Sequence, residues 1–214
     1  MPDYTGCLIT SWARDGNGMI ESIAQRVAKI TSQQQSLGFK VLSLVGGGIL
    51  FVVLIPFLLG IIGRSAAGTL LPREGFAIRY SVGIPAIAVG LGILIWAVKA
   101  FWSLGAGTPV PVAAPQRLVT KGPYRYCRNP IQLGAMILYF GMGTVADSTI
   151  IGVIMFGFAL ILGSVYHRHI EEKELQLRFG AEYEEYRRAT PFLLPRFGRH
   201  QSKERPNNGV EPTR

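Results

Sequence analysis

Four long stretches without a charged residue constrain this chain more than any other feature. They are Val41–Ile62, Tyr80–Val98, Ile131–Ala146 and Ser148–Tyr166. A helix needs about 20 apolar residues to cross a bilayer, with a range of about 17 to 25. Three of the runs meet this length, and only Asp147 separates the shorter third run from the fourth. We therefore predict an all-α, polytopic membrane protein with about four transmembrane helices, in which the third and fourth form a tight hairpin.

The predicted spans lie near residues 39–62, 80–101, 131–146 and 148–167. Buried helices of a soluble core are the alternative, but three full-length runs in one small chain argue against it. Charged residues make up 16% of the 214 positions, well below the ~25% of soluble proteins. The length suits one domain, which we place at 39–198, between a polar segment 1–38 and a tail 199–214 that we expect to be disordered.

The net charge of +9 reads as a topology signal, because the basic residues gather on one side of the predicted spans. That side carries Arg26, Lys29, Lys40, Lys99, Arg117, Lys121, Arg125, Arg128, Arg168, Lys173 and Arg178, and the other side carries Arg64, Arg73 and Arg79. Cytosolic loops are enriched in Lys and Arg, so both termini and the loop 99–130 are predicted to be cytosolic. We expect no nucleic-acid partner, and membrane lipids with anionic headgroups as neighbours.

The first forty residues give weaker signals. The first apolar run starts late and has no small-residue cleavage site before it, so we expect it to be retained as a helix. Within "MIESIAQRVAKI", residues 19–30, the apolar side chains share one helical face. A helix lying in the membrane interface and a solvated helix packed on the domain fit this pattern equally.

The segment "LVTKGPYRYCRNPIQLG", residues 118–134, places a basic turn directly before the third predicted helix. Gly122-Pro123 is a turn signal, and Pro130 suits the first position of a helix. The start of that helix, preceded by Arg125 and Arg128, has the character of an anion site. Ordinary cytosolic charge that anchors the helix explains these residues alone equally well.

A second polar segment, "YHRHIEEKELQLRFGAEYEEY", follows the fourth predicted helix. Because helices three and four form a hairpin, both segments emerge on the same side of the membrane. Glu171 and Glu172 point about 100° apart on a helix and do not form a couple acting on one bond. His167 and Glu171 are four residues apart, but two ligands make a weak metal site, and Cys7 and Cys127 have no metal or redox spacing. We predict no metal and two free thiols.

Together the two segments resemble a known family. "GPYRYCRNPIQLG", a helical hairpin and then "EEKELQLRFGAEYEEYRRATPFLLPRF" are similar to the integral-membrane methyltransferases of the isoprenylcysteine carboxyl methyltransferase and phospholipid N-methyltransferase superfamily. The preceding "GAGTPVPVAAPQRLV" resembles the loop before the motif in many bacterial members. The resemblance covers residues 100–197, and it implies a multi-pass protein of a bacterial inner membrane with its active site on the cytosolic face.

The resemblance implies a transferase that moves a methyl group from S-adenosylmethionine to a lipid-like or small apolar acceptor. The implied cofactor-binding residues are Gly122, Pro123, Tyr124, Arg125, Arg128, Asn129, Pro130, Gly134, Glu171, Glu172 and Tyr183. The implied catalytic residues are Glu172, as a base for an amine or thiol acceptor, with Arg168 and His167. Arg168 or Arg128 would orient a carboxylate acceptor, which needs no base.

Three positions depart from the family pattern. Asn129 stands where members usually have His, and Gln132 where they often have Tyr. His167 stands where the prenylcysteine enzymes have an Arg associated with the substrate carboxylate, so the sequence favours another acceptor. Two other functions remain: a membrane reductase using NADPH, for which the chain is short, and a non-catalytic four-helix protein that contacts lipid or a partner.

Overall fold

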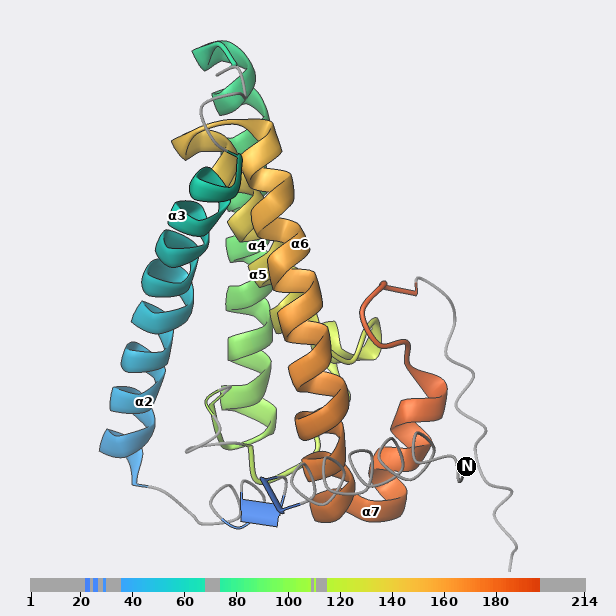
Figure 1. The fold of residues 1–214 in the computed structure, drawn as a ribbon. Coiled ribbons are helices and arrows are strands. Elements are labelled where there is room, and N and C mark those ends of the chain that lie inside the picture. Colours follow the sequence, from blue (N-terminus) through green and yellow to red (C-terminus); the bar gives the residue numbers. More distant parts are fainter. Residues whose placement is uncertain are drawn as a thin grey trace, which may run out of the picture.

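The computed structural model describes residues 36–67, 74–108, 110 and 115–196, together with isolated positions between 22 and 29. The predictions for the segment 19–30, the tail 199–214 and Cys7 concern residues that lie mostly or wholly outside these described ranges. The described chain is built of helices (Figure 1). In order they are α2 (Leu37–Ile49), η1 (Leu50–Leu54), α3 (Ile55–Ala67), α4 (Phe76–Leu104), η4 (Gly122–Arg125), α5 (Pro130–Ala146), α6 (Thr149–Tyr166), η5 (His167–Glu171) and α7 (Glu172–Ala189).

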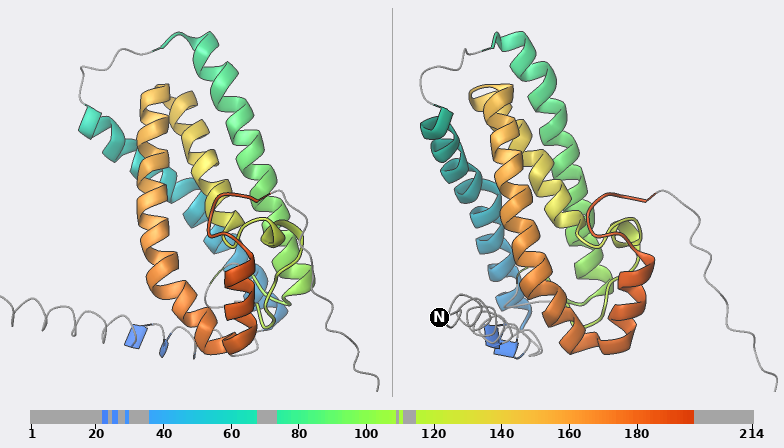
Figure 2. Two further views of the ribbon diagram at one scale, coloured as in Figure 1. Left: turned by 90° about the vertical axis from the view of Figure 1, so that its right-hand side faces the viewer. Right: turned by 45° about the vertical axis from the view of Figure 1, so that its right-hand side comes forward.

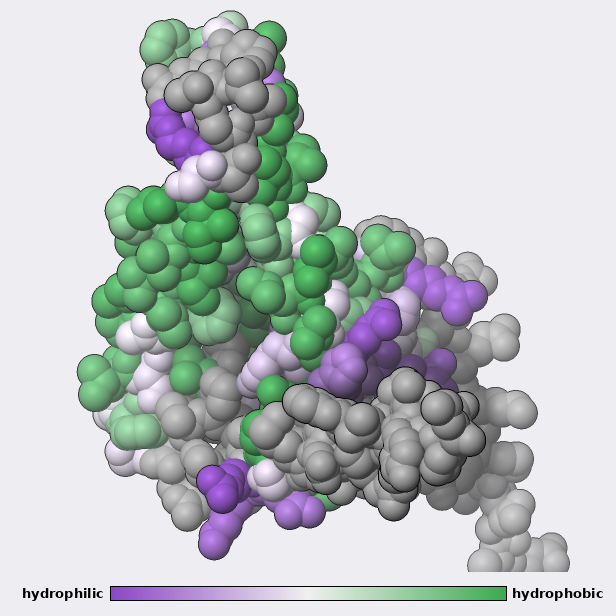
Figure 3. Space-filling model, viewed as in Figure 1, coloured by the Kyte–Doolittle hydropathy of each residue, from purple (hydrophilic) through white to green (hydrophobic). Residues whose placement is uncertain are grey.

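The predicted membrane architecture is confirmed. Three helices are long and apolar enough to cross a bilayer, and they begin at Leu37, Phe76 and Thr149. The third predicted span is the 17-residue helix α5, which is apolar but shorter. Figure 3 shows apolar side chains covering much of the middle and upper molecule, with a small polar patch near the top and larger polar patches toward the opposite end. Hydrophobic side chains facing outward in this way are what lipid requires of a spanning bundle.

The first span contains a local change of helix type with a clear cause. α2 and α3 are joined by the π-helical turn η1, in which the N–H of Ile55 donates to the carbonyl of Leu50. In the same register the Phe51 carbonyl would face the nitrogen of Pro56, which has no hydrogen to donate. The hydroxyl of Tyr139 on α5 donates to that carbonyl at 2.6 Å. The bond satisfies a backbone group inside the membrane, where an unpaired one is costly, and ties the first span to α5.

Helices α4 and α5 pack most extensively, along a seam of glycines. Gly83 and Gly90 of α4 face Gly141 and Gly134 of α5. A methyl group on Gly90 would come within 2.6 Å of the Leu138 backbone nitrogen, and one on Gly141 within 2.7 Å of the Gly83 carbonyl oxygen. Small residues allow membrane helices to approach this closely. Gly92 of the same helix differs, because a methyl group added there would meet open space.

Charged side chains close the end of the bundle at the α5–α6 turn. Arg79 of α4 donates to the carbonyls of Thr144 and Val145, at the C-terminus of α5. The carboxylate of Glu74 accepts from the backbone nitrogen of Thr149, at 3.3 Å, and from its hydroxyl, at 2.6 Å. A cation thus meets the negative end of one helix, and an anion meets the positive end of the next. Arg64 adds an ion pair with Asp147, at 2.9 Å, in the turn itself.

Candidate functional site

The loop before α5 is folded against the last part of α4, at the end of the bundle opposite the α5–α6 turn. Gly122 has φ +66°, a conformation that favours glycine, and it begins the short helix η4. Tyr124 is buried and its ring stacks on Phe101 with centroids 4.7 Å apart. Trp96 contacts Tyr126, with centroids 6.1 Å apart. From Arg79 to Trp96 the helix rises about 25 Å, so the loop lies close to the far boundary of a hydrocarbon layer ~30 Å thick.

The second polar segment reaches this loop because the helix that leaves the membrane changes direction twice. The π-helical turn η5 joins α6 to α7, and Gly180 inside α7 has φ +52°, which breaks the helix there. The end of α7 therefore turns back beside the loop (Figure 2). The Tyr186 hydroxyl donates to the Tyr124 carbonyl at 2.8 Å, and Tyr183 is almost fully buried. The predicted meeting of the two motifs is present in the structure.

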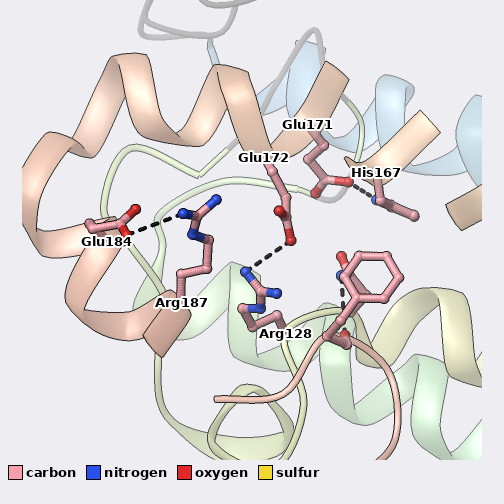
Figure 4. A network of polar contacts seen from close by, with 8 residues as sticks. Arg128, His167, Glu171, Glu172, Glu184 and Arg187 are labelled. Carbon is pink, nitrogen blue, oxygen red and sulfur yellow. Dashed lines mark hydrogen bonds and ion pairs between the residues drawn. The ribbon is translucent and has the colours of Figure 1, made fainter. Parts of the chain in front are cut away.

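An ion pair between Arg128 and Glu172 joins the two motifs (Figure 4). Arg128 Nη1 lies 2.9 Å from Glu172 Oε1, and the two side chains are only 12% and 16% exposed. The contact lacks the alignment of a hydrogen bond, and Arg128 Nε, Arg128 Nη1 and Glu172 Oε1 are buried without a hydrogen-bond partner among the described residues. Buried charged groups normally have their hydrogen bonds satisfied. These atoms therefore offer donors and an acceptor to a ligand.

The adjacent Glu171 forms a separate contact with His167. Its carboxylate faces Nδ1 of His167 (Figure 4). Because an ionised carboxylate only accepts, this contact requires the histidine proton on Nδ1. The two adjacent glutamates thus point to different partners, as their 100° separation predicts. The guanidinium of Arg168 lies 4.7 Å from the centre of the Phe192 ring.

The chain after α7 crosses the loop and completes this end of the molecule. We call residues 191–196 the strap. The backbone nitrogens of Arg128 and Asn129 donate to the carbonyls of Pro191 and Phe192, and the backbone nitrogen of Arg196 donates to Tyr126. The Asn129 side-chain nitrogen also lies 3.2 Å from the Phe192 carbonyl oxygen. The strap lies at the end of the second segment that resembles the family, but no role was predicted for its individual residues.

Several residues predicted for the site have other surroundings in the structure. Arg125 is exposed and its guanidinium lies over Tyr126, 5.1 Å from the ring centre. Gly134 belongs to the seam with α4. Pro130 is the first residue of α5, as predicted, but the backbone N–H groups of the two residues before it are bound by the strap. Of the two arginines in the first motif, the structure therefore brings Arg128, and not Arg125, to Glu172.

Burial sets the protonation of two groups in the loop. Desolvation raises the pKa of Tyr124 well above its usual value, with smaller contributions from Tyr186 and Cys127. Burial also raises the pKa of the Cys127 thiol to about 11, against the opposing effect of a backbone hydrogen bond at Asn129. Both groups are therefore neutral near pH 7.

The fold and this arrangement define a class: a helical membrane protein with a partly buried, polar site where two motifs meet at one end of its bundle. Residues 78–182, which contain nearly all of α4, the loop, the α5–α6 hairpin and most of α7, match the phospholipid methyltransferase family. This match and the named relatives below support the superfamily of integral-membrane methyltransferases that includes the phospholipid and isoprenylcysteine enzymes.

Individual relatives align with the chain over similar lengths. It is 32% identical over 87 residues to the nickel-cobalt-cadmium resistance protein NccN of Alcaligenes xylosoxydans xylosoxydans, covering 40% of this chain and 39% of that protein. It is 30% identical over 83 residues to methanethiol S-methyltransferase 2 of Bradyrhizobium diazoefficiens, covering 38% and 30%. It is 34% identical over 80 residues to the mouse protein-S-isoprenylcysteine O-methyltransferase, covering 36% and 27%. The alignments thus span about two fifths or less of these relatives.

Proposed function

We propose that this protein is an S-adenosylmethionine-dependent methyltransferase that acts on a lipid-like or small apolar acceptor. The observation that carries the proposal is the Arg128–Glu172 pair, which joins the two family motifs at one partly buried place. Membership of a methyltransferase superfamily supports the reaction class. The named relatives include enzymes for a thiol and for a prenylated cysteine, which supports an acceptor of low polarity.

The residues around this pair fit the proposed cofactor chemically. S-adenosylmethionine carries a carboxylate, an ammonium group and a sulfonium centre. Arg128 has two buried nitrogens without a hydrogen-bond partner among the described residues, and Glu172 has one such oxygen. A guanidinium suits the carboxylate, and a glutamate suits a cationic group. Tyr183, which interacts with both Arg128 and Glu172, would help to hold the same ligand.

The bound cofactor supplies an electrophilic methyl group on its sulfonium, and methyl transfer is a one-step displacement that depends on alignment and a dry site. Because Glu172 is already paired with Arg128, we infer that this glutamate binds the cofactor and does not act as a base. A carboxylate acceptor would then need only a cation such as Arg168 beside it. An amine or thiol acceptor would have to lose its proton to water or to another group, for which His167 of η5 is the candidate that the sequence names.

We propose that the site faces the cytosol and that both termini lie on that side. The excess of basic residues on one side of the spans supports this orientation. Reporter fusions after residue 70 and after residue 110 should then report opposite sides of the membrane. If both fusions report the same side, the proposed topology is wrong.

Two ligand-binding experiments separate this function from the alternatives. Purified full-length protein is titrated calorimetrically with S-adenosylhomocysteine and, separately, with NADPH. Binding of the first alone supports the methyltransferase, binding of the second alone supports a reductase, and binding of neither supports a non-catalytic protein. Transfer of radiolabelled methyl groups from S-adenosylmethionine into a total lipid extract then identifies the acceptor through its labelled product.

A further inference from the structure

We propose that Phe192 in the strap is a positioning residue that sets the place of both Arg128 and Arg168. The proposal rests on the proposed function, because it assigns Phe192 a part in binding the cofactor. Its basis is a pair of contacts that the sequence did not predict: one aromatic ring, near the end of the second segment, lies close to a cation from the loop before α5 and to a cation from η5.

Contacts on the Phe192 backbone hold the ring near both arginines. Its carbonyl accepts from the backbone nitrogen of Asn129 at 3.2 Å and from the Asn129 side chain at 3.2 Å. The preceding carbonyl, of Pro191, accepts from the Arg128 nitrogen at 2.9 Å. Because these bonds hold the backbone on both sides of the Phe192 Cα, the side chain starts from a fixed position close to the backbone of Arg128.

Two guanidinium groups lie over this ring from different elements. The Arg128 guanidinium carbon is 5.8 Å from the ring centre, and the Arg168 guanidinium carbon is 4.7 Å away. Both are within the ~6 Å at which the face of an aromatic ring attracts a cation. The loop before α5 supplies Arg128 and the turn η5 supplies Arg168, so the ring contacts cations on both sides of the α5–α6 hairpin.

The link has a consequence for charge at the site. Arg128 is paired with Glu172, but the described part of the chain contains no carboxylate paired with Arg168. Two like charges near one place repel each other, and the negative face of a ring offsets part of this repulsion without neutralising either cation. Phe192 would therefore keep Arg128 directed at Glu172. It would also hold Arg168 near Arg128, with the charge of Arg168 available to a ligand.

Asn129 has a defined part in this arrangement. It stands where the family usually has His, and its side-chain nitrogen binds the Phe192 carbonyl. We infer that in this chain Asn129 holds the strap in place and affects cofactor binding only through the position of the strap. Asn129→Asp, which replaces the donor with a charged acceptor facing a carbonyl, should loosen the strap and reproduce the effect of losing the ring.

The test compares Phe192→Leu, which removes the ring, with Phe192→Trp, which keeps an aromatic face. In the full chain, Phe192→Leu should weaken S-adenosylhomocysteine binding about 5- to 20-fold, and Phe192→Trp should stay within about threefold of the unaltered protein. Phe76→Leu is the matched control, because Phe76 also lies under an arginine, Arg79, at 5.6 Å, but at the opposite end of the bundle. It should leave the affinity unchanged.

A second measurement does not depend on the cofactor. Phenylglyoxal modifies accessible arginines, and mass spectrometry reports the rate at Arg168. Loss of the ring should raise that rate about two- to fivefold in Phe192→Leu and not in Phe192→Trp. Equal rates in all three proteins would overturn the positioning role, as would a Trp variant that binds as weakly as the Leu variant. Failure of the unaltered protein to bind S-adenosylhomocysteine would overturn the proposed function instead, and the labelling rates would still decide the position of Arg168.

Discussion

The two ends of the helical bundle use charged residues differently. At the α5–α6 turn, Arg79 and Glu74 bind backbone groups and one hydroxyl at the ends of two helices, and the ion pair of Arg64 with Asp147 includes an arginine side chain that is 56% exposed. At the other end, Arg128 and Glu172 meet side chain to side chain across two segments that are distant in sequence. The first arrangement satisfies helix ends that belong permanently to the fold. The second leaves buried polar atoms without hydrogen bonds, and a ligand can supply those bonds.

This difference follows from where the charges act. Charges at helix termini interact with fixed backbone dipoles, and they stabilise the helices whether or not a ligand is present. An ion pair that is only partly exposed loses hydration, and this loss offsets much of the attraction between its charges. We therefore interpret the α5–α6 end as structural and the Arg128–Glu172 end as functional. The following experiments test that assignment.

The largest effect on stability is expected from a substitution in the seam between α4 and α5, because both ends of the bundle depend on these two helices. Gly90 lies in the seam between α4 and α5, and a side chain there meets main-chain atoms of α5 at less than 3 Å. Gly90→Val should destabilise the protein by about 3 kcal/mol or more, at or above the upper range for overpacking, because backbone cannot move aside as a flexible side chain does. Gly92→Val, at a glycine with open space, is the control. Melting temperatures in detergent should separate the two variants clearly, and similar melting would show that the seam is not tightly packed.

The next effect should be confined to the functional end. Arg128→Ala removes a charged donor from the proposed cofactor site and should weaken S-adenosylhomocysteine binding by about 1.5–3 kcal/mol, the range for a hydrogen bond to a charged group. Arg128→Lys keeps the charge but loses the planar guanidinium group, and its affinity for S-adenosylhomocysteine should lie between those of Arg128→Ala and the unaltered protein. The measurement is calorimetric titration of the folded proteins.

Arg125→Ala is the matched control for this experiment, because Arg125 is exposed and lies over Tyr126. It should change the affinity by less than about threefold, the scale of one exposed cation–π pair. A larger loss for Arg125 than for Arg128 would contradict the site as the structure shows it and support the anion site that the sequence placed at Arg125.

The contrast between these two arginines shows what the sequence could not predict. Both arginines carry the same charge and lie within a few residues of the start of α5, so no local sequence pattern distinguishes them. Only the short helix η4 and the path of α7 decide which of them meets Glu172. The strap was missed for a similar reason, because its backbone carbonyls bind nitrogens some sixty residues away, and backbone bonds leave little trace in side-chain chemistry.

Other features were predictable because their causes are local. The length of an uncharged run determines whether a helix spans a bilayer, so the spans and the turn at Asp147 were predicted close to their observed positions. The seven-residue spacing of Gly83 and Gly90 could have identified the seam, since it repeats every two helical turns, whereas Gly92 falls on another face. The meeting of the two motifs depends on the α5–α6 hairpin, and the sequence predicted that hairpin.

A smaller effect is expected at the structural end. Glu74→Ala removes the acceptor for the Thr149 backbone nitrogen and hydroxyl and should lower stability by about 1 kcal/mol, as for other N-terminal helix caps. S-adenosylhomocysteine affinity should not change. Glu185→Ala, at an exposed glutamate of α7, should alter stability by less than about 0.5 kcal/mol. A loss of cofactor affinity in Glu74→Ala would mean that the two ends are coupled, and the division between them would fail.

The smallest effect concerns Cys127, which reports whether the functional end is closed. Burial raises the pKa of its thiol to about 11, and only the thiolate reacts rapidly with alkylating agents. At pH 8 about a thousandth of the thiol is ionised, and the fraction rises as the pH approaches 11, so alkylation by iodoacetamide should be very slow at pH 8 and faster at higher pH. The measurement is made in a Cys7→Ser background, where Cys127 is the remaining cysteine. Because the loop that carries Cys127 is bonded to the strap, Asn129→Asp should increase the rate at pH 8, while Glu74→Ala should not. Rapid labelling of the Cys7→Ser protein at pH 8 would show that this end is open and that the loop is not held against α4 and the strap.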